Sequence, residues 1–598
     1  MDRSTFLGFV LIGILLMVWL WMNNPPPQKN QPGADTLLVK KGAEDTTHSG
    51  VSKPSQEPGT TSSVDTLGKY FNHLAAGEEK YLTIETDLYT AVLTSQGGGI
   101  HSWTLKKFLT WDKYPVNLIN PGTQSDFNIL FYSSDGKLIN SKNLGFSSDL
   151  PNGKTITLSN QDSLKIEYTL PVVGESRIIK ELVFTNGKYS FDAHFRFEKM
   201  ENIISNFEYQ VVWESGLKYA ERNSVDESNS AMAYAYGGGE VTDVDATKFD
   251  ESITQSPSGK FKWVAERTKY FGLAIICQDE AGSQGAYLDG IRLHKPDNGA
   301  EEYYSIGMKM QYLGKDTENS NFTVFFGPLD YNLVKSYNVD LEKIMNLGAA
   351  WVIRPIAEYI MLPLFQFIHL LIPNYGIVII VFSIIIKIVL YPLTKTSMKS
   401  MQKMQKLQPM MEELKVKYKD DPQKMNQAVM RLYKEYGVNP AGGCLPMLLQ
   451  LPILYALWAV FRTTIQLRQA AFFGWIHDLS IPDVIAKLPF PLPIMNITEI
   501  SGLSLFMGIT MFVQQKMSVK DPRQKMMVWM MPLMMTLIFN NFPAGLNLYY
   551  FVFNILQIGQ QWYLNKTHQD EPLRKVEEKK KSGGILARMT KDMPKLKR

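Results

Sequence analysis

A long apolar run from Tyr375 to Leu393 carries a single charged side chain, that of Lys387. The run reads IVIIVFSIIIKIVLYPL from Ile377 onward, and as a helix it is long enough to cross a lipid bilayer. A charge near the middle of such a span costs about 2.5–3.5 kcal/mol, so a lysine there is by default a candidate for function. The alternative is that Lys387 lies near the cytoplasmic end and extends its side chain to the lipid headgroups. The run by itself does not separate these two interpretations.

Apolar residues are otherwise concentrated at the N-terminus and beyond about residue 345 of the 598-residue chain. Phe6 to Met22 contains no charge, and no cleavage motif of small residues follows it. We therefore expect residues 1–24 to form an uncleaved signal anchor that crosses the membrane once. Because Arg3 precedes this span, the positive-inside rule places the N-terminus in the cytoplasm.

A linker and then a β domain are predicted to follow the anchor. Residues 25–65 are rich in Pro, Gly, Ser and Thr without a sustained apolar period, which is typical of a flexible linker. From residue 66 to 335 the chain changes to short alternating apolar and polar runs, and at least ten strands fit this pattern. We therefore predict an all-β sandwich over residues 66–335.

One hairpin of this domain can be predicted in detail. Alternating apolar residues that include Phe184 and Phe191 flank the dipeptide Asn186-Gly187. Asn-Gly supplies the two positive φ angles that a tight type I′ turn needs, so we expect two antiparallel strands joined by this turn.

The sequence shows no motif for covalent chemistry. The two cysteines, Cys277 and Cys444, fall in the β domain and at the start of an apolar segment, so no disulfide is expected. The eight histidines show no metal-ligand spacing, and there is neither a nucleotide-binding glycine loop nor a Gly-x-Ser-x-Gly motif. We predict no catalytic residue, no metal and no cofactor, and the chain is not expected to be an enzyme.

The second half of the chain is predicted to form a membrane core. Residues 336–374 are apolar but are interrupted by charges and prolines, which favours an amphipathic helix in the outer interface. Residues 375–564 are expected to supply five spans, the Lys387 run being the first of them. The other four are Gly443–Phe461, Leu503–Val513 with its flanks, Met526–Phe542 and Ala544–Leu564. With the signal anchor, this makes a polytopic protein of six spans with both termini in the cytoplasm.

The distribution of charge supports this topology. Thr394 to Tyr436, Lys516 to Lys525 and the tail over residues 565–598 carry net charges of +5, +3 and +6, although the whole chain is only +4. Six spans place all three basic segments in the cytoplasm, whereas the loop from Thr464 to Ile500 lies outside and is not enriched in cations. This is the asymmetry that the positive-inside rule requires.

The last predicted span carries a stripe of polar residues. The residues Asn547, Tyr550, Asn554, Gln557 and Gln561 recur at spacings of three and four, so they share one face of a helix. Ser383, Lys387 and Tyr391 form a similar stripe on the first core span, and Gln450 adds an amide on another. Such side chains must face other helices or a water-filled interior, because lipid cannot satisfy their hydrogen bonds.

Two interpretations of these stripes stay open. The amides either join helices through interhelical hydrogen bonds or line a hydrophilic interior. The five core spans contain no carboxylate near their middle that would neutralise Lys387, which favours the hydrophilic interior. A proton-coupled transporter would usually need such a carboxylate.

The cytoplasmic segment over residues 394–436 is predicted to be a helical hairpin. Met398, Met401 and Met404 belong to its apolar face, and Lys399 and Lys403 to a basic face. A methionine-rich surface can adapt to many apolar sequences, which suits contact with varied substrates. The hairpin is equally consistent with contact with acidic lipid headgroups, and the two roles are compatible.

Several motifs resemble those of one family. The sequences Y-P-L-T-K from Tyr391, V-N-P-A-G-G-C-L-P from Val438, L-R-Q-A from Leu467, W-I-H-D-L-S from Trp475 and F-P-A-G-L-N-L-Y-Y from Phe542 are similar to the YidC-type membrane protein insertases. The resemblance covers residues 345–564 in order. An N-terminal anchor with a large extracytoplasmic β domain resembles the Gram-negative form, in which that domain is a β-supersandwich.

The resemblance implies an insertase and chaperone that works alone or with the Sec translocon and does not hydrolyse nucleotides. In this family a cation on the first core span projects into a hydrophilic groove, and the position that usually holds arginine is Lys387 here. Lysine keeps the charge but lacks the fork that binds a carboxylate through two hydrogen bonds. The resemblance also assigns Ser383 and Tyr550, beside Tyr549, to the groove. The expected groove residues are thus Ser383, Lys387, Tyr391, Gln450, Asn547, Tyr549, Tyr550, Asn554, Gln557 and Gln561.

The expected partners are nascent membrane proteins, the Sec translocon and membrane lipids, with a monomer as the working unit and no DNA. The basic tail after Leu564 either contacts ribosomal RNA or lies solvated near lipid. The expected location is the bacterial inner membrane, with the β domain in the periplasm. A polytopic solute transporter with a periplasmic binding domain is the alternative, but paired half-repeats and intramembrane carboxylates are missing.

Overall fold

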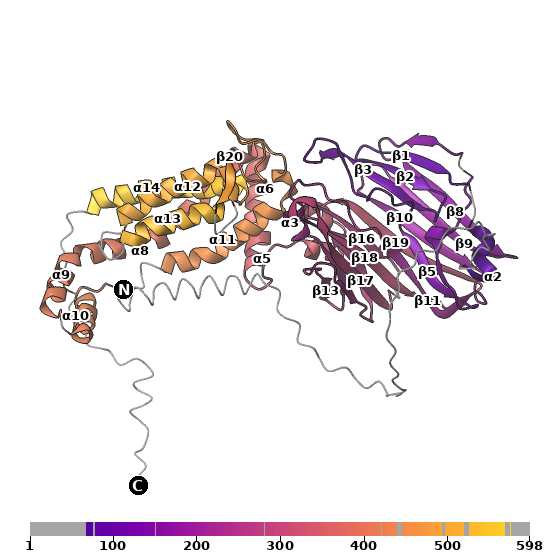
Figure 1. The fold of residues 1–598 in the computed structure, drawn as a ribbon, viewed down its shortest axis with the longest axis horizontal. Coiled ribbons are helices and arrows are strands. Elements are labelled where there is room, and N and C mark those ends of the chain that lie inside the picture. Colours follow the sequence, from indigo (N-terminus) through magenta and orange to yellow (C-terminus); the bar gives the residue numbers. More distant parts are fainter. Residues whose placement is uncertain are drawn as a thin grey trace, which may run out of the picture. The chain divides into compact units, whose positions relative to one another are not determined.

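The computed structural model describes residues 67–75, 78–149, 151–279, 282–419, 421–438, 445–492, 497–518, 525–568 and 575. The predicted signal anchor and linker, and the basic tail beyond residue 568 apart from Lys575, lie outside these residues. Along the described chain, a β-rich part is followed by a helical part (Figure 1).

The β-rich part contains three sheets, in which every pair of neighbouring strands is antiparallel except β1 and β7. The five-stranded sheet has the order β4 (Pro115–Asn117), β3 (Gly99–Leu109), β2 (Tyr89–Thr94), β1 (Tyr81–Glu85) and β7 (Lys154–Thr157). The eight-stranded sheet has the order β13 (Glu240–Val244), β12 (Met232–Gly237), β15 (Phe261–Arg267), β16 (Phe271–Cys277), β19 (Thr317–Pro328), β10 (Ser190–Glu198), β9 (Ser176–Thr185) and β8 (Ser163–Val173). The six-stranded sheet has the order β14 (Ser252–Gln255), β17 (Gly285–Lys295), β18 (Gly299–Gln311), β11 (Ile204–Trp213), β5 (Asn128–Ser133) and β6 (Leu138–Asn140). The prediction of a β-sandwich in this part of the chain is confirmed.

Short helices precede, separate and follow these strands. They are α2 (Gly68–Phe71), α3 (Ser224–Ser228), α4 (Tyr331–Lys335) and the single turns Asn72–Leu74, Ser141–Asn143 and Pro296–Asn298. Aromatic side chains fill the space between the sheets. Trp103 is fully buried, with its ring centroid 3.8 Å from that of Tyr89 and 5.2 Å from that of Phe326. Alternate residues of β10 point inward, as a strand with one buried face requires.

The predicted hairpin is confirmed, but its turn is not of the predicted type. Strands β9 and β10 are antiparallel, with Phe184 opposite Phe191. The connection is longer than two residues, and in the dipeptide Asn186-Gly187 only the glycine has a positive φ, of 80°. The side-chain oxygen of Asn186 accepts a hydrogen bond of 2.8 Å from the backbone N–H of Asp87. This contact with a distant loop fixes the asparagine in another conformation, which local sequence could not show.

A buried lysine joins two loops inside the sandwich. Lys180 of β9 is inaccessible to solvent, and its Nζ donates 2.8 Å hydrogen bonds to the carbonyl oxygens of Gly97 and Phe127. Gly97 has a φ of 71°, and a Cβ atom there would lie 2.7 Å from Ser125 Oγ, so glycine permits this close packing. Burial lowers the pKa of Lys180 to about 7.

Raising the pH from 7 to 10 is therefore expected to stabilise the β domain through Lys180. In this range the unfolded chain still holds a proton that the folded chain has lost, so the free energy of unfolding rises by up to about 1.4 kcal/mol per pH unit. Urea unfolding of the parent and of Lys180→Met at pH 7, 8 and 9 measures the difference between their slopes. Lys154→Met, at an exposed position of β7, is the matched control. Equal slopes for the parent and Lys180→Met would contradict this expectation.

The helical part starts with a helix that contains a π-helical turn, and a break between two further helices follows it. After a turn at Leu341–Ile344, residues 353–371 form α5 (Ile353–Ile356), a π-helical turn η5 (Ala357–Met361) and α6 (Leu362–Leu371). Helix α7 (Tyr375–Val389) follows and ends before the last residues of the apolar run that carries Lys387. Helix α8 (Tyr391–Lys406) begins two residues after the end of α7. Pro392 lacks the N–H that would continue the helical ladder, which explains the break between α7 and α8.

Within the described residues, none of the helices taken singly has both the length and the apolar character needed to cross a membrane. Helix α7 and the helical residues 394–406, bent by 66° relative to each other, meet that test together.

The basic segment after α7 contains a helical hairpin. Helix α9 (Gln408–Lys417) packs against α10 (Pro422–Glu435), whose first turn is capped by Asp421 through a 3.0 Å bond from the N–H of Lys424. The buried side chains that hold the two helices together are Leu407, Met411, Leu432, Tyr436 and Val438.

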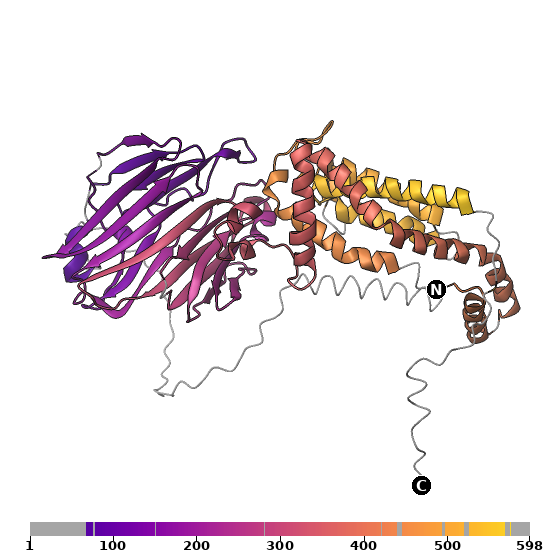
Figure 2. The same ribbon diagram turned by 180° about the vertical axis from the view of Figure 1, so that it is seen from behind.

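The remaining helices form the bundle that carries the polar stripes. They are α11 (Leu445–Thr463), the turn Ile465–Leu467, α12 (Gly502–Ser518), α13 (Lys525–Phe539) and α14 (Ala544–His568). A two-stranded sheet of β20 (Val484–Leu492) and β21 (Ile497–Ser501) precedes α12. Helix α12 packs against both α13 and α14, and α14 also packs against α7 (Figures 1 and 2). Helix α6 runs across these helices rather than along them (Figure 2).

Candidate functional site

Lys387 lies in the last turn of α7 and points toward α14. Only 6% of the residue is exposed, and its Nζ donates a hydrogen bond to Oε1 of Gln557. The same ammonium group lies 4.5 Å from the centre of the Phe553 ring, which attracts it through a cation–π interaction. The lysine is therefore turned into the bundle and does not extend toward solvent.

Gln557 accepts a hydrogen bond from the ammonium group of Lys387, but a neutral amide does not neutralise the positive charge of that group. The described residues include no carboxylate that forms an ion pair with Lys387. Ser383, one turn earlier on α7, is fully buried and donates a 2.7 Å hydrogen bond to the carbonyl oxygen of Ile379 in its own helix. Tyr391 lies apart from this group, because it is 37% exposed beyond the end of α7.

The stripe on α14 bonds to two neighbouring helices. Nδ2 of Asn554 lies 3.4 Å from Oγ1 of Thr510 on α12, and Oε1 of Gln561 accepts a 2.9 Å bond from Ser518. Asn554 and Gln561 are both buried. These are interhelical bonds of the kind expected if the amides join helices. We call the residues of these bonds, together with Lys387 and Gln557, the polar layer.

The part of the stripe near the N-terminal end of α14 contains polar atoms without a hydrogen-bond partner. Asn547 is fully buried and donates a 3.1 Å bond to the carbonyl oxygen of Phe539, yet its Oδ1 makes no hydrogen bond. The hydroxyl group of Tyr550 is also buried without a hydrogen bond. Tyr549, beside it, is buried with its ring centroid 5.8 Å from that of Phe553. Buried atoms of this kind are rare, and they can hydrogen-bond to a polar group that enters the interior.

The other predicted residues lie outside this layer. Gln450 is half-buried on α11. On α8, Met398 is buried, Lys399 is half-buried and Lys403 is exposed. Met401 and Met404 are half-buried, so the methionine face is less accessible than the sequence pattern indicates.

Three residues of the layer were not expected from the sequence. Phe553 supports the ammonium group of Lys387, and Thr394 accepts a 3.2 Å bond from Nε2 of Gln560. Phe553 lies four residues before Gln557 on the same helical face, and this spacing could have indicated that it belongs to the polar layer. Thr394 and Gln560 are far apart in sequence, so only the packing of α8 against α14 reveals their contact.

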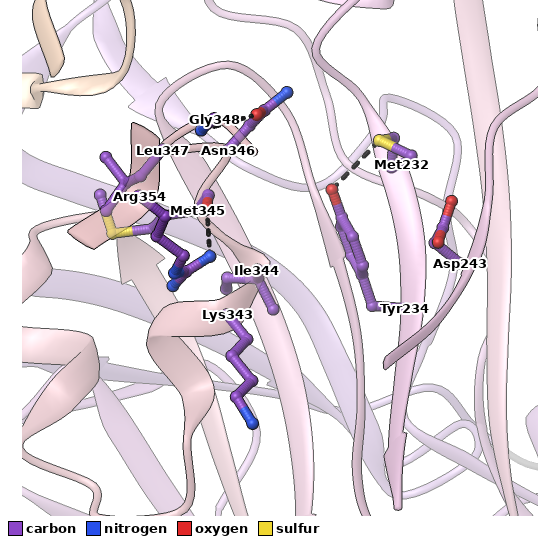
Figure 3. Close-up of a pocket in the computed structure, with 10 residues that line it drawn as sticks. All are labelled: Met232, Tyr234, Asp243, Lys343, Ile344, Met345, Asn346, Leu347, Gly348 and Arg354. Carbon is purple, nitrogen blue, oxygen red and sulfur yellow. Dashed lines mark hydrogen bonds between the residues drawn. The ribbon is translucent and has the colours of Figure 1, made fainter. Parts of the chain in front are cut away.

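A pocket of about 200 Å³ between β12, β13 and the segment that leads into α5 is separate from this layer. Met232 and Tyr234 of β12 and Asp243 of β13 form one side, and the segment that leads into α5 forms the other (Figure 3). Arg354 Nη1 donates a 3.2 Å hydrogen bond to the carbonyl oxygen of Met345 at this pocket. Among the described residues, no three His, Cys, Asp or Glu side chains are placed to share a metal ion.

Two family models match the chain, one after the other. The model of the YidC periplasmic domain matches residues 81–359, and that of the 60Kd inner membrane protein matches residues 367–571. The membrane protein insertase YidC of Chlorobaculum tepidum is 39% identical over 575 residues, covering 96% of each chain. The chain belongs to the YidC family of membrane protein insertases. The resemblance inferred from the sequence motifs is thereby confirmed.

A second curated relative agrees with this result. The YidC insertase of Chloroherpeton thalassium is 37% identical over 96% of this chain and 97% of its own. A crystal structure of an active YidC insertase with its first transmembrane domain resolved is 20% identical, covers 82% of this chain and 93% of that one, and has a TM-score of 0.36. The YidC-family protein described here is an inner-membrane protein with a β-rich periplasmic domain. It is an insertase and not an enzyme.

Proposed function

We propose that this YidC-family insertase accepts nascent membrane proteins through a hydrophilic groove whose cation is Lys387. The observation that carries the proposal is the buried ammonium group of Lys387, which is bonded to an amide and, among the residues that the structure describes, is not paired with a carboxylate. Most of the expected groove residues lie on α7 and α14, the two helices that this bond joins. They are Ser383 on α7 and Asn547, Tyr549, Tyr550, Asn554, Gln557 and Gln561 on α14.

The proposed mechanism has three physical parts. Amide and hydroxyl groups of α14 reduce the cost of bringing the polar tail of a substrate into the membrane, because the tail keeps its hydrogen bonds. Lys387 attracts acidic tails, and this attraction is stronger in the low dielectric of the bundle than in water. The apolar segment of the substrate then enters the lipid, which supplies the net driving force. No covalent step is needed.

We further propose six spans, with both termini in the cytoplasm and the β domain in the periplasm. The basic segments at 394–436, 516–525 and 565–598 support this orientation through the positive-inside rule. In this arrangement the hairpin of α9 and α10 meets substrates or headgroups at the cytoplasmic surface. We infer that a monomer works alone or with the Sec translocon, and that the basic tail approaches the ribosome or lipid.

Depletion of the protein tests the proposed substrate class. Translocation of a small single-span protein with a short acidic N-terminal tail is expected to slow after depletion, because its tail depends on the polar groove. Pulse labelling with protease protection of the tail measures the rate. Unchanged kinetics after depletion would contradict the proposal.

Thiol labelling distinguishes a groove from a stripe that only joins helices. In a chain without Cys277 and Cys444, we expect Asn554→Cys and Gln557→Cys to react with a water-soluble maleimide added from the cytoplasmic side. Ile555→Cys is the matched control, because Ile555 is a 45% exposed apolar residue on another face of α14 and should face lipid. Equal protection at all three positions would show that the stripe holds helices together and does not contact water.

A further inference from the structure

The loop before β20 ends in a buried carboxylate that binds the first turn of α12. Oδ2 of Asp483 accepts hydrogen bonds of 2.9 Å from Nε1 of Trp475 and 2.7 Å from the N–H of Leu503, and Oδ1 accepts one of 2.5 Å from Oγ of Ser501. Asp483 is only 5% exposed. One acidic side chain therefore connects the loop of residues 475–483, called the outer loop below, with the end of β21 and the start of α12.

These donors explain why a charge is tolerated at this buried position. Within the described parts of the chain, Asp483 forms no ion pair. Three hydrogen bonds to the carboxylate and the positive end of the α12 dipole offset the cost of removing the charge from water. Removing the carboxylate would leave donors of three separate segments without their common acceptor.

The same network continues to the ends of α13 and α14. Oδ1 of Asn540, directly after α13, accepts a 2.9 Å bond from the N–H of Ser501, and its Nδ2 donates a 2.7 Å bond to the carbonyl oxygen of Glu499. Asn547 of α14 donates to the carbonyl oxygen of Phe539 at the end of α13. The ends of three helices thus meet around Ser501.

The outer loop also caps α14 directly. The N–H of Ala544 donates a 2.8 Å bond to the carbonyl oxygen of Ile481, and the N–H of Gly545 donates a 2.9 Å bond to that of Leu479. A Cβ atom at position 545 would lie 3.1 Å from the oxygen of Leu479, so glycine allows this close approach. Residues 475–483 therefore bind the first turns of both α12 and α14.

We propose that Asp483 is a positioning residue that holds the outer ends of α12, α13 and α14 together and so closes the polar interior on the periplasmic side. The inference rests on the proposed groove, because it assigns a barrier to that groove. Asn554 and Gln557 lie farther along α14, on the cytoplasmic side of this network. A substrate tail could then enter from the cytoplasm while the outer end stays shut.

Side-specific labelling of Asn554→Cys tests the barrier. The chain lacks Cys277 and Cys444, is placed in sealed vesicles, and receives a membrane-impermeant maleimide on one side at a time. Without a substitution at Asp483 we expect labelling from the cytoplasmic side only. With Asp483→Ala, labelling from the periplasmic side should become at least about tenfold faster, because a buried charged acceptor is lost, and the cytoplasmic rate should stay the same.

Two further variants guard against a general folding defect. Trp475→Phe removes one hydrogen-bond donor to the carboxylate of Asp483 and should increase labelling from the periplasmic side by a smaller factor. If Asp483→Ala does not accumulate in the membrane, this variant tests the role of Asp483 in its place. Lys487→Ala is the matched control, because Lys487 lies on β20 with 69% of its side chain exposed. It should leave both rates unchanged.

The outcomes separate the two proposals. Labelling of Asn554→Cys from neither side would contradict the polar groove itself. Cytoplasmic labelling without any periplasmic gain in Asp483→Ala and Trp475→Phe would leave the groove intact and overturn the role of Asp483. An equal gain from both sides would indicate general loosening of the bundle and would also overturn that role.

Discussion

Lys387→Ala is expected to slow the insertion of a substrate with an acidic N-terminal tail by about tenfold or more, whereas Lys387→Arg should stay close to the parent rate. Two opposite charges about 4 Å apart attract by about 4 kcal/mol at an effective dielectric constant of about 20, and a third of this changes a rate about tenfold. Arginine keeps the charge and adds donors, so it should preserve this attraction. Pulse labelling in cells that depend on the variant measures the rate.

Lys387→Met separates charge from packing. Methionine keeps much of the length that lies over the Phe553 ring but removes the ammonium group. It should therefore resemble Lys387→Ala for an acidic tail, and both variants should have little effect on the same substrate with a neutral tail. Equal slowing by alanine and arginine would show that charge at this position is not how the insertase recognises the tail.

Arg468→Ala is expected to loosen the contact between the β domain and the segment that follows α11 by about 3–5 kcal/mol, the usual cost of removing one member of a buried ion pair. Nε of Arg468 lies 2.5 Å from Oε1 of Glu221, and the two side chains are 2% and 11% exposed. The guanidinium group also donates to the carbonyl oxygen of Leu109. Amide hydrogen exchange over residues 464–470 should become about 100-fold faster or more.

A double variant tests whether the buried charge of Glu221 causes this effect. Arg468→Met combined with Glu221→Gln removes both charges and should recover much of the lost protection, because no unpaired charge remains. Arg177→Ala removes the exposed member of the ion pair between Arg177 and Glu198, and it should change stability by less than about 1 kcal/mol. Unchanged exchange in Arg468→Ala would show that this ion pair does not hold the two parts together.

The polar layer was predictable where it follows helical spacing. Lys387 stands out as a charge in an apolar run, and Asn554 and Gln557 share a face because their positions on α14 repeat with the helical period. Helical spacing in the sequence could not predict which residues of different helices contact each other. The partner of Lys387 is Gln557, which lies 170 residues later in the chain, and only the packing of α7 against α14 selects it.

The β domain shows the same limit. Alternation predicted strands and the β9–β10 hairpin, because one face of each strand must be buried. Strand order was not accessible: β10 pairs with β19, whose residues lie more than 100 positions away. Asp483 was missed because a single acid in a loop has no periodic signal, and its importance arises from donors contributed by Trp475, Ser501 and Leu503.

The hydrogen bond between Lys387 and Gln557 has a consequence for turnover. A carboxylate in place of Gln557 would hold the cation tightly, and an incoming acidic tail would have to displace an equal charge. Within the described residues the amide holds the ammonium group and no carboxylate pairs with it, so in the proposed mechanism an acidic tail can exchange with the amide at low cost. After the tail has left, the ammonium group of Lys387 donates its hydrogen bond to Gln557 again. In the proposed mechanism the site can therefore release its substrate and return to its starting state without an external source of energy.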